Sequence, residues 1–291
     1  MPKGKGPLKA RLLLCASAMA IAWTAPSAAA ELKPKTVAAF EHYVAAVEQD
    51  LAERIDGRRP FLLVEGSPEA MRRMRAGEVV VEKLQQIKDF DVPSGIIHDW
   101  AGTIFIPRTP DQILAIQRDY DHHSDIYPEV KASRLIESGK DRLTGYLRIE
   151  KTQVITVVLD TVNEVHYREL AGGRRYVRSF STRINQVKDA GTPEEKLLPV
   201  GDDSGYLWRL NAYWLLQPTA GGTQVECRAV TLTRGIPTLL AWIVKPFVTG
   251  VPRESLTQTL TATREAVLRA FPDRASPASS TAESVTSAPD R

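Results

Sequence analysis

The chain has 291 residues, of which 43% are hydrophobic and 25% are charged, with 38 basic against 35 acidic side chains. This length and hydrophobic content are enough for one sizeable core or two small ones, and they exclude a chain that is disordered throughout. The near balance of charge gives no indication of a nucleic-acid partner.

The first thirty residues are predicted to be a secretory signal that is not part of the fold. Four basic residues lie within the first eleven positions, the apolar run "LLLCASAMAIAW" occupies 12–23, and small residues lead to Ala30. This pattern is typical of a cleaved leader, and the apolar run is too short for a membrane span. We therefore expect cleavage after Ala30 and a mature protein that is periplasmic or secreted.

Removal of this leader changes the charge and the cysteine content. The four basic residues leave with it, so 34 basic side chains remain against 35 acidic ones, a formal charge of −1. Cys15 also leaves, and Cys227 is then the single thiol of the mature chain. A single thiol cannot form an internal disulfide, so the exported protein is expected to be held together by its core.

Residues 31–92 are predicted to form a helical N-terminal extension that packs on the rest of the chain. Apolar residues recur at three- and four-residue steps over 36–56, which is typical of an amphipathic helix. A second helix is predicted over 67–77, with Ser67 as its N-cap and Pro68 at its first position. The stretch "EVVVEKL" at 78–84 is predicted to be a strand.

From residue 95 the hydrophobic period changes to two. The stretch "GIIHDWAGTIFIP" predicts a strand with one face made of Ile96, His98, Trp100, Ile104 and Ile106. A helix capped by a threonine–proline pair comes next, in "RTPDQILAIQRDY".

A run of short strand candidates fills the chain up to residue 234. Glycine pairs at 172–173 and 221–222 separate alternating runs, as in β-hairpins, so we expect an antiparallel sheet. A long helix is predicted from Pro252, and residues 273–291 are predicted to be a disordered tail because they are rich in Ser, Ala and Pro without apolar anchors.

Four stretches carry a resemblance to a known family: "HDWAGTIFIPRTPDQILAIQRDYDHHSDIYPEV", "GYLWRLNAYWLLQ", "VECRAVTLTRGIP" and "PRESLTQTLTATREAV". They resemble the START-like superfamily of polyketide cyclases/dehydrases and lipid-transport proteins (SRPBCC, helix-grip), and in particular exported bacterial members of it. The resemblance covers residues 93–272. It implies an α+β helix-grip fold, in which a curved antiparallel sheet wraps around a long C-terminal helix and can enclose a cavity for a hydrophobic small molecule or lipid.

Candidate ligand-binding residues are identified from the strand faces. The strand at 205–217 has one face with Trp214, while Arg209, Asn211 and Tyr213 lie on the other, and the pattern leaves open whether this second face meets solvent or the cavity. A cluster of arginines turned inward would indicate an anionic ligand. The full candidate set is His98, Trp100, Arg148, Arg209, Asn211, Tyr213, Trp214 and Arg228.

No metal, cofactor or catalytic residue is predicted. The stretch "DYDHHSDIYPEV" at 119–130 contains adjacent histidines, His122 and His123, which do not share a helix face, and we interpret it as a solvated loop. An acid/base pair is conceivable among Asp160, Glu164 and His166. Nucleophile-elbow, P-loop and dinucleotide-binding motifs are absent from the sequence.

These observations support three functional hypotheses. The first is a non-enzymatic carrier or sensor of a hydrophobic small molecule or lipid. The second is a cyclase- or hydrolase-type enzyme that uses the same cavity with His98, and the third is a protein-interaction module that pairs through its N-terminal helix. The apolar stretch "IPTLLAWIVKPFVTGVP" beginning at residue 236 is interpreted as ordinary packing, as a cavity entrance, or as a transient contact with a membrane surface.

Overall fold

A computed structural model describes residues 30–272 except 89, 153–154 and 236–240, and for 241–249 it describes the backbone only. The predicted leader, the predicted C-terminal tail and most of the apolar stretch after residue 235 therefore lie outside the described side chains. None of the helices in the described part of the chain combines the length and hydropathy needed to cross a membrane.

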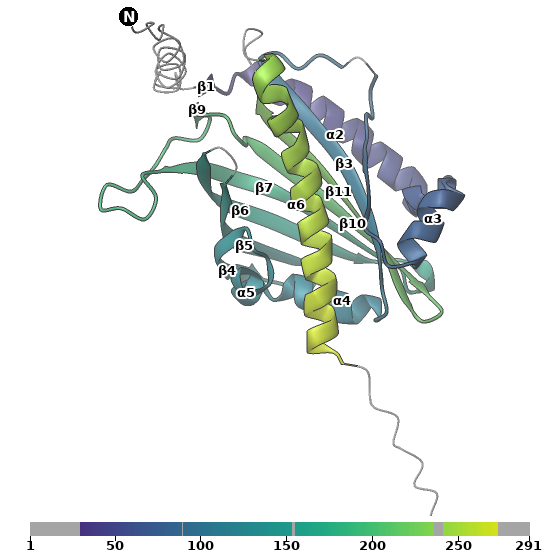
Figure 1. The fold of residues 1–291 in the computed structure, drawn as a ribbon. Coiled ribbons are helices and arrows are strands. Elements are labelled where there is room, and N and C mark those ends of the chain that lie inside the picture. The colour runs from purple at the N-terminus through teal and green to yellow at the C-terminus, as the bar shows by residue number, and fades with distance from the viewer. Residues whose placement is uncertain (1–29, 89, 153–154, 236–240, 273–291) are drawn as a thin grey trace, which may run out of the picture.

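The described chain forms an antiparallel sheet between two long helices (Figure 1). The helical elements are α2 (Pro34–Ile55), η1 (Leu63–Gly66), α3 (Pro68–Arg75), α4 (Pro110–Arg118), η2 (Tyr120–His122), α5 (His123–Ile126), η3 (Ala171–Gly173) and α6 (Ala241–Ala270). The strands are β1 (Ala30–Glu31), β2 (Val80–Lys83), β3 (Gly95–Ile106), β4 (Val130–Ser138), β5 (Arg142–Thr152), β6 (Thr156–Glu169), β7 (Arg175–Lys188), β8 (Lys196–Leu197), β9 (Asp202–Asp203), β10 (Arg209–Thr219) and β11 (Gly222–Arg234).

The main sheet has nine strands in the order β2-β3-β11-β10-β7-β6-β5-β4, with β8 paired to β7. Strand β2 comes from the N-terminal extension, so residues 78–84 contribute an edge strand as predicted. Both predicted glycine turns are confirmed, since 172–173 connect β6 to β7 and 221–222 connect β10 to β11. Positive φ angles at Gly172, Gly173 and Gly221 explain the choice of glycine there.

Two helix starts follow the predicted capping chemistry. The Ser67 side chain accepts from the backbone N–H of Ala70, and Thr109 accepts from Gln112. The prediction for the last helix was wrong at its N-terminal end, because α6 begins at Ala241 and continues through Pro252. A proline removes only one N–H donor from the helix ladder, and here the helix runs on through it.

Helix α6 lies along one side of the curved sheet, with β7, β6 and β5 beyond it (Figure 1). It packs mainly against β3, and it also approaches β2, β11, α4 and α5. At Gly102 of β3 the approach is close, because an added Cβ would lie 2.6 Å from Leu260 Cδ1. Helix α2 covers the opposite face of the sheet, so each face has its own hydrophobic cluster. The helix-grip arrangement predicted from the sequence is confirmed by this topology.

Candidate functional site

The sheet face toward α6 has a closed part and an accessible part. Strand register aligns residues across β3, β11, β10 and β7 in rows. The row Gly102, Cys227 and Val177 is buried, with Leu256 and Leu260 of α6 in the same core cluster. Trp214 belongs to this row but is only half-buried.

The two rows that follow the Gly102 row toward Gly95, the first residue of β3, are more accessible. One contains Trp100, Ala229, Ala212 and Ser179, and the other contains His98, Thr231, Leu210 and Ser181. All of these except His98 are half-buried. We call this surface the concave patch and define it as His98, Trp100, Ser179, Ser181, Leu210, Ala212, Trp214, Ala229 and Thr231. Four of its side chains are alanine or serine and two are tryptophan, so small and large side chains lie next to one another on this surface.

The opposite face of the same strands is different. The side chains that face α2 are the alternate residues 211, 213 and 215 of β10 and 224, 226, 228, 230 and 232 of β11. All of them are buried. Neither alternative left open for the face with Asn211 and Tyr213, solvent or a cavity, is correct, because α2 covers both residues. Tyr213 donates to Glu48 of α2, and Asn211 donates to Tyr213. Accessible surface on these central strands thus lies mainly on the α6 side.

The predicted site residues separate into two groups. His98, Trp100 and Trp214 lie together on the α6 face, within the concave patch. Asn211, Tyr213 and Arg228 lie on the α2 face, and Arg209, which alternates with them, donates to the carbonyl of Trp208. Arg148 lies on the face of β5 away from α6, and its guanidinium pairs with both carboxylate oxygens of Asp160, at 2.7 and 2.9 Å, and with Glu195. The structure therefore does not bring the eight residues into one site.

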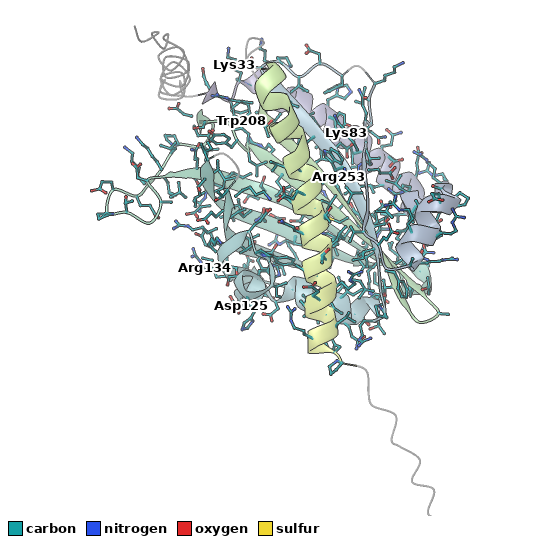
Figure 2. All side chains as sticks on the ribbon, viewed as in Figure 1. Lys33, Lys83, Asp125, Arg134, Trp208 and Arg253 are labelled. Carbon is teal, nitrogen blue, oxygen red and sulfur yellow. The ribbon has the colours of Figure 1, made fainter. Side chains whose placement is uncertain are left out.

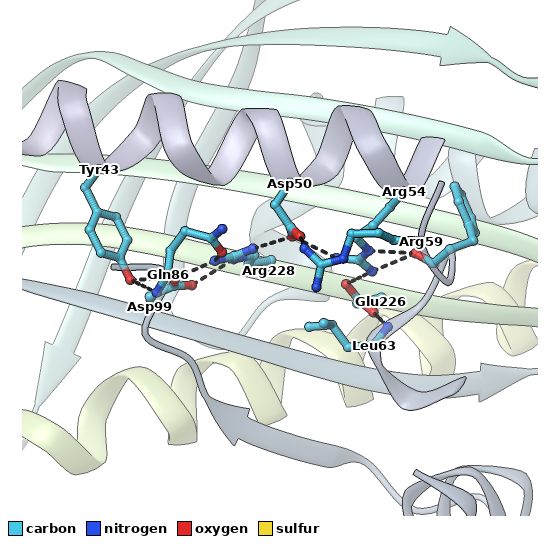
Figure 3. Close-up of polar contacts among 10 residues, drawn as sticks. Tyr43, Asp50, Arg54, Arg59, Leu63, Gln86, Asp99, Glu226 and Arg228 are labelled. Atoms are coloured by element: carbon cyan, nitrogen blue, oxygen red, sulfur yellow. Dashed lines mark hydrogen bonds and ion pairs between the residues drawn. The ribbon is translucent and has the colours of Figure 1, made fainter. Parts of the chain in front are cut away.

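A network of buried charges joins α2 to the sheet (Figure 3). Arg228 donates to both carboxylate oxygens of Asp99, at 2.9 and 2.6 Å, and to Asp50 of α2 at 3.3 Å. Arg54 of α2 donates to Glu226 at 2.6 Å, and the second oxygen of Glu226 accepts from the backbone of Leu63. All of these charged side chains are at most 5% exposed. Together with their uncharged partners they form the α2 network: Tyr43, Asp50, Arg54, Gln86, Asp99, Glu226 and Arg228.

This network explains why a buried Arg228 needs no anionic ligand. Three carboxylates (Asp50, Asp99 and Glu226) face two buried arginines, and Arg59, which is half-exposed, forms an ion pair with Asp50. Burial raises the pKa of the Glu226 carboxyl, while the Arg54 charge opposes that shift. The charges compensate one another inside the protein, as buried charges generally must.

Sequence reasoning missed most of the α2 network. One signal was present, because Asp50 and Arg54 are four residues apart on the same face of α2 as Val47 and Leu51. Charges on the apolar stripe of an amphipathic helix indicate buried partners. Their partners on β3 and β11 are more than a hundred residues distant in some cases, and no local pattern identifies them.

Polar groups at the concave patch are neutral. His98 is 3% exposed, and its Nε2 lies 3.1 Å from Thr233 Oγ1. Burial, and then the charge of Lys83, lower the pKa of His98 to about 4, so the imidazole is uncharged at neutral pH. The Trp100 indole Nε1–H is buried, and it has no hydrogen-bond partner among the residues that the structure describes.

The histidines of segment 119–130 point to different environments. His122 is exposed and bonds Asp119 at 2.7 Å, which raises its pKa. His123 is 6% exposed, its ring lies against Tyr120, and its Nε2 is 3.3 Å from the carbonyl of Ile116. The prediction of a solvated loop was therefore wrong for His123, because η2 and α5 turn it into the core. No metal-binding group of three His, Cys, Asp or Glu side chains occurs among the residues that the structure describes.

The conceivable acid/base residues lie outside the concave patch. Glu164 Oε1 is 2.6 Å from His166 Nε2, and both side chains face away from α6 near Arg142. Asp160 is held by Arg148 and Tyr146. Cys227 lies in the middle of β11 and is buried, and burial raises the pKa of its thiol, which disfavours the thiolate form.

Comparisons with known proteins concern the fold. No protein-family model matches the sequence, and no curated protein matches it significantly. Similar solved structures include a STAR-related lipid transfer protein fragment from Xanthomonas axonopodis, 19% identical over 64% of this chain and 98% of that chain, with a TM-score of 0.43. Others are the Zhui aromatase/cyclase from Streptomyces sp. R1128 (12% identical, 61% and 98% covered, TM-score 0.42) and human STARD10 (14% identical, 66% and 74% covered, TM-score 0.42).

Identities below 20% and TM-scores below 0.5 carry no information on what this chain binds or whether it is an enzyme. The assignment of the helix-grip fold rests on the order of the strands and on the position of α6 along the sheet.

Proposed function

We propose that this protein is an exported, non-enzymatic carrier or sensor of a hydrophobic small molecule or lipid, which binds against the concave patch. The observation that carries the proposal is the difference between the two faces of β10 and β11. The α2 face is closed by packing, whereas Leu210, Ala212 and Trp214 on the α6 face keep accessible apolar surface. Apolar surface with a few placed polar groups is typical of sites for hydrophobic ligands.

The hydrophobic effect sets the size of ligand that this surface needs. Burial of each CH₂ group contributes about 0.8 kcal/mol, so an eight-carbon chain contributes roughly 6 kcal/mol before the costs of association. That free energy corresponds to a dissociation constant of roughly tens of micromolar. Ligands with shorter chains should therefore bind weakly, and chains of about twelve carbons or more should remain bound during purification.

Native mass spectrometry of the mature protein, followed by extraction and identification of bound molecules, tests the proposal directly. A blocked variant, Ala212→Trp, places a large side chain among the small ones of the patch and should abolish the rise in melting temperature that a long-chain ligand produces. The matched control is Ala132→Trp, the same change at an exposed position of β4. Equal ligand-induced shifts in both variants would refute binding at the concave patch.

Export is part of the same proposal and has its own test. The leader pattern supports cleavage after Ala30, so the N-terminal sequence of protein recovered from outside the cytoplasm should begin at Glu31. Recovery there of protein that still begins at Met1 would contradict it.

The two alternative functions receive less support from the contacts. An enzyme that uses His98 would need that imidazole to reach a substrate, but it is almost fully buried and bonds Thr233. An interaction module that pairs through α2 would need a free apolar face on that helix, but Phe40, Val47 and Leu51 are buried on the sheet. Turnover that is lost in His98→Ala while the fold persists would favour the enzyme.

A further inference from the structure

Lys83 places a positive charge at the β2 edge of the concave patch; a role for that charge in ligand binding rests on the proposed function. In the antiparallel pairing of β2 with β3, Lys83 lies directly opposite Trp100. Directly opposed side chains project from the same face of a sheet, with their Cβ atoms about 5 Å apart. The Lys83 side chain therefore lies on the α6 face, beside Trp100.

The charge of Lys83 is not compensated by a carboxylate of the described chain. Lys83 is exposed, and none of the described acidic side chains lies within ion-pair distance of it. Glu82, its neighbour in the chain, is in register with Ala101 and therefore lies on the other face of the sheet. Asp99 also lies on that face, where Arg228 holds it. An anion that approaches Lys83 from the α6 side thus meets a free cation.

The field of Lys83 reaches the interior of the patch. Burial, and then the charge of Lys83, lower the pKa of His98, whose side chain is almost fully buried. On α6, which approaches β2, Glu254 is bonded to Lys151, and Arg253 is a second exposed cation (Figure 2). The charged groups at this edge of the patch therefore favour an anion.

Trp100 adds an unpaired hydrogen-bond donor beside Lys83. Its indole Nε1–H is buried and finds no acceptor within the described part of the chain. An indole N–H can only donate, and a hydrogen bond to a charged acceptor is roughly twice as strong as one between neutral groups. Buried donors in proteins are almost always paired, so this one indicates where an oxygen atom of a ligand would be accepted.

The arrangement of charge and apolar surface suits an amphiphile. An anion loses favourable hydration when it is buried, so a charged head group is best placed beside an exposed cation, where water remains. The row that begins at Trp100 continues through Ala229 and Ala212 to Ser179, and none of these side chains carries a charge. Small uncharged side chains leave room for a hydrocarbon chain, while the head group stays near Lys83.

We propose that the ligand is an anionic amphiphile, whose carboxylate or phosphate head group binds between the Lys83 ammonium and the indole N–H of Trp100, with its chain on the concave patch. Lys83 supplies the charge, and Trp100 supplies a directed hydrogen bond. We call this pair the head-group site. Because Lys83 is exposed, its contribution is moderate and is screened by salt.

Dodecanoate and 1-dodecanol make a matched pair of probes, because they share the chain length and differ in charge. At pH 8 and low ionic strength, Lys83→Gln should weaken binding of dodecanoate to the mature protein about three- to tenfold, and should change binding of 1-dodecanol less than about twofold. Lys83→Arg keeps the charge and should retain most of the affinity. The control is Lys188→Gln, the same change at an exposed position of β7. Competition or native mass spectrometry measures the affinities.

Salt and the tryptophans give two further readouts. Higher ionic strength should weaken dodecanoate binding more in the wild type than in Lys83→Gln, since only the wild type has the charge to be screened. Trp100→Phe keeps a ring and removes the N–H, so it should weaken dodecanoate about three- to tenfold. Trp214→Phe, the same chemical change on the same face, should weaken it less. Circular dichroism and melting temperature establish that all variants are folded before their affinities are compared.

The outcomes separate the head-group site from the proposed function. If Lys83→Gln weakens dodecanoate no more than Lys188→Gln does, or weakens 1-dodecanol equally, the head-group site is wrong while hydrophobic ligand binding stands. If Trp100→Phe weakens dodecanoate no more than Trp214→Phe does, the assignment of Trp100 fails. If acetate or inorganic phosphate displaces dodecanoate at comparable concentrations, the site takes free anions and the amphiphile is excluded. If neither probe binds and no lipid is extracted, the proposed function itself fails.

Discussion

The α2 network predicts that Arg228→Met destabilises the protein strongly, although methionine fits a hydrophobic interior. Arg228 is 1% exposed and donates to Asp99 twice, to Asp50 and to Gln86. After the substitution, Asp99 would keep only the hydroxyl of Tyr43, at 2.9 Å, as its side-chain donor. Removal of one partner from a buried ion pair costs about 3 to 5 kcal/mol, because the remaining charge stays buried without compensation.

We therefore expect a loss of about 4 kcal/mol from a total stability on the order of 5 to 15 kcal/mol. In a chain of this size this corresponds to a decrease in melting temperature of roughly 10 °C. Urea denaturation at pH 7, monitored by tryptophan fluorescence, measures the free energy of unfolding. The control is Arg178→Met, since Arg178 pairs with Glu48 on the same face but both are 33% exposed, and the expected cost is below about 1 kcal/mol.

A double variant tests whether the buried charges compensate one another. Arg228→Met combined with Asp99→Asn removes both charges, so it should be less destabilised than Arg228→Met alone by about 1 kcal/mol or more. If Arg228→Met costs no more than Arg178→Met, or if the double variant is the less stable one, the α2 network does not behave as a compensated buried cluster. For the same reason, deletion of residues 31–92 should abolish folding, because it removes Asp50 and Arg54 and exposes the face of the sheet that α2 covers.

Buried side chains give three further predictions. His123→Ala should lower the free energy of unfolding by about 2 to 3 kcal/mol, because the His123 ring is buried. His122→Ala, at the adjacent exposed position, should leave the denaturation midpoint unchanged. Equal effects of the two substitutions would contradict the placement of the two rings. Gly145→Ala should lower the melting temperature, because an added Cβ would overlap the Tyr120 ring, and an unchanged melting curve would show that the ring moves freely. The folded-state pKa of His98, about 4, lies below the usual value of 6.5, so its stabilising contribution is complete above pH 6.5 and is lost as the pH falls toward 4. Wild-type protein should therefore lose about 3 kcal/mol more between pH 7 and pH 4 than His98→Asn does, and parallel pH profiles would exclude a buried neutral imidazole.

Local signals in the sequence located most of the elements, and the family resemblance supplied the fold class. The serine and threonine caps before Pro68 and Pro110 start helices where predicted, and the glycine pairs make hairpins. These features act within a few residues of the chain, through backbone sterics and single hydrogen bonds. The period of two along β3 also correctly placed His98 and Trp100 on the same face.

Tertiary structure alone decided which face of each strand meets which helix. A period of two assigns residues to two faces of a strand but does not identify the helix that packs on each face. Here α6 packs on one face of the sheet and α2 on the other. Tyr213 and Asn211 therefore lie under α2, although their polarity was compatible with solvent or with a cavity. Trp208 also lies on the α2 side, because it precedes β10 and does not follow the alternation of that strand.

The partners of the buried charges are also decided by tertiary structure and not by local sequence. Arg228 has one acidic neighbour in its own strand, Glu226, but the carboxylates that it bonds, Asp99 and Asp50, lie 129 and 178 residues earlier in the chain. Whether a buried arginine binds a ligand or an internal carboxylate depends on where those distant segments pack. The sequence by itself therefore determined most of the elements and their order, whereas long-range packing decided that Arg54 and Arg228 hold α2 on the sheet and that the accessible surface of the central strands lies on the α6 side.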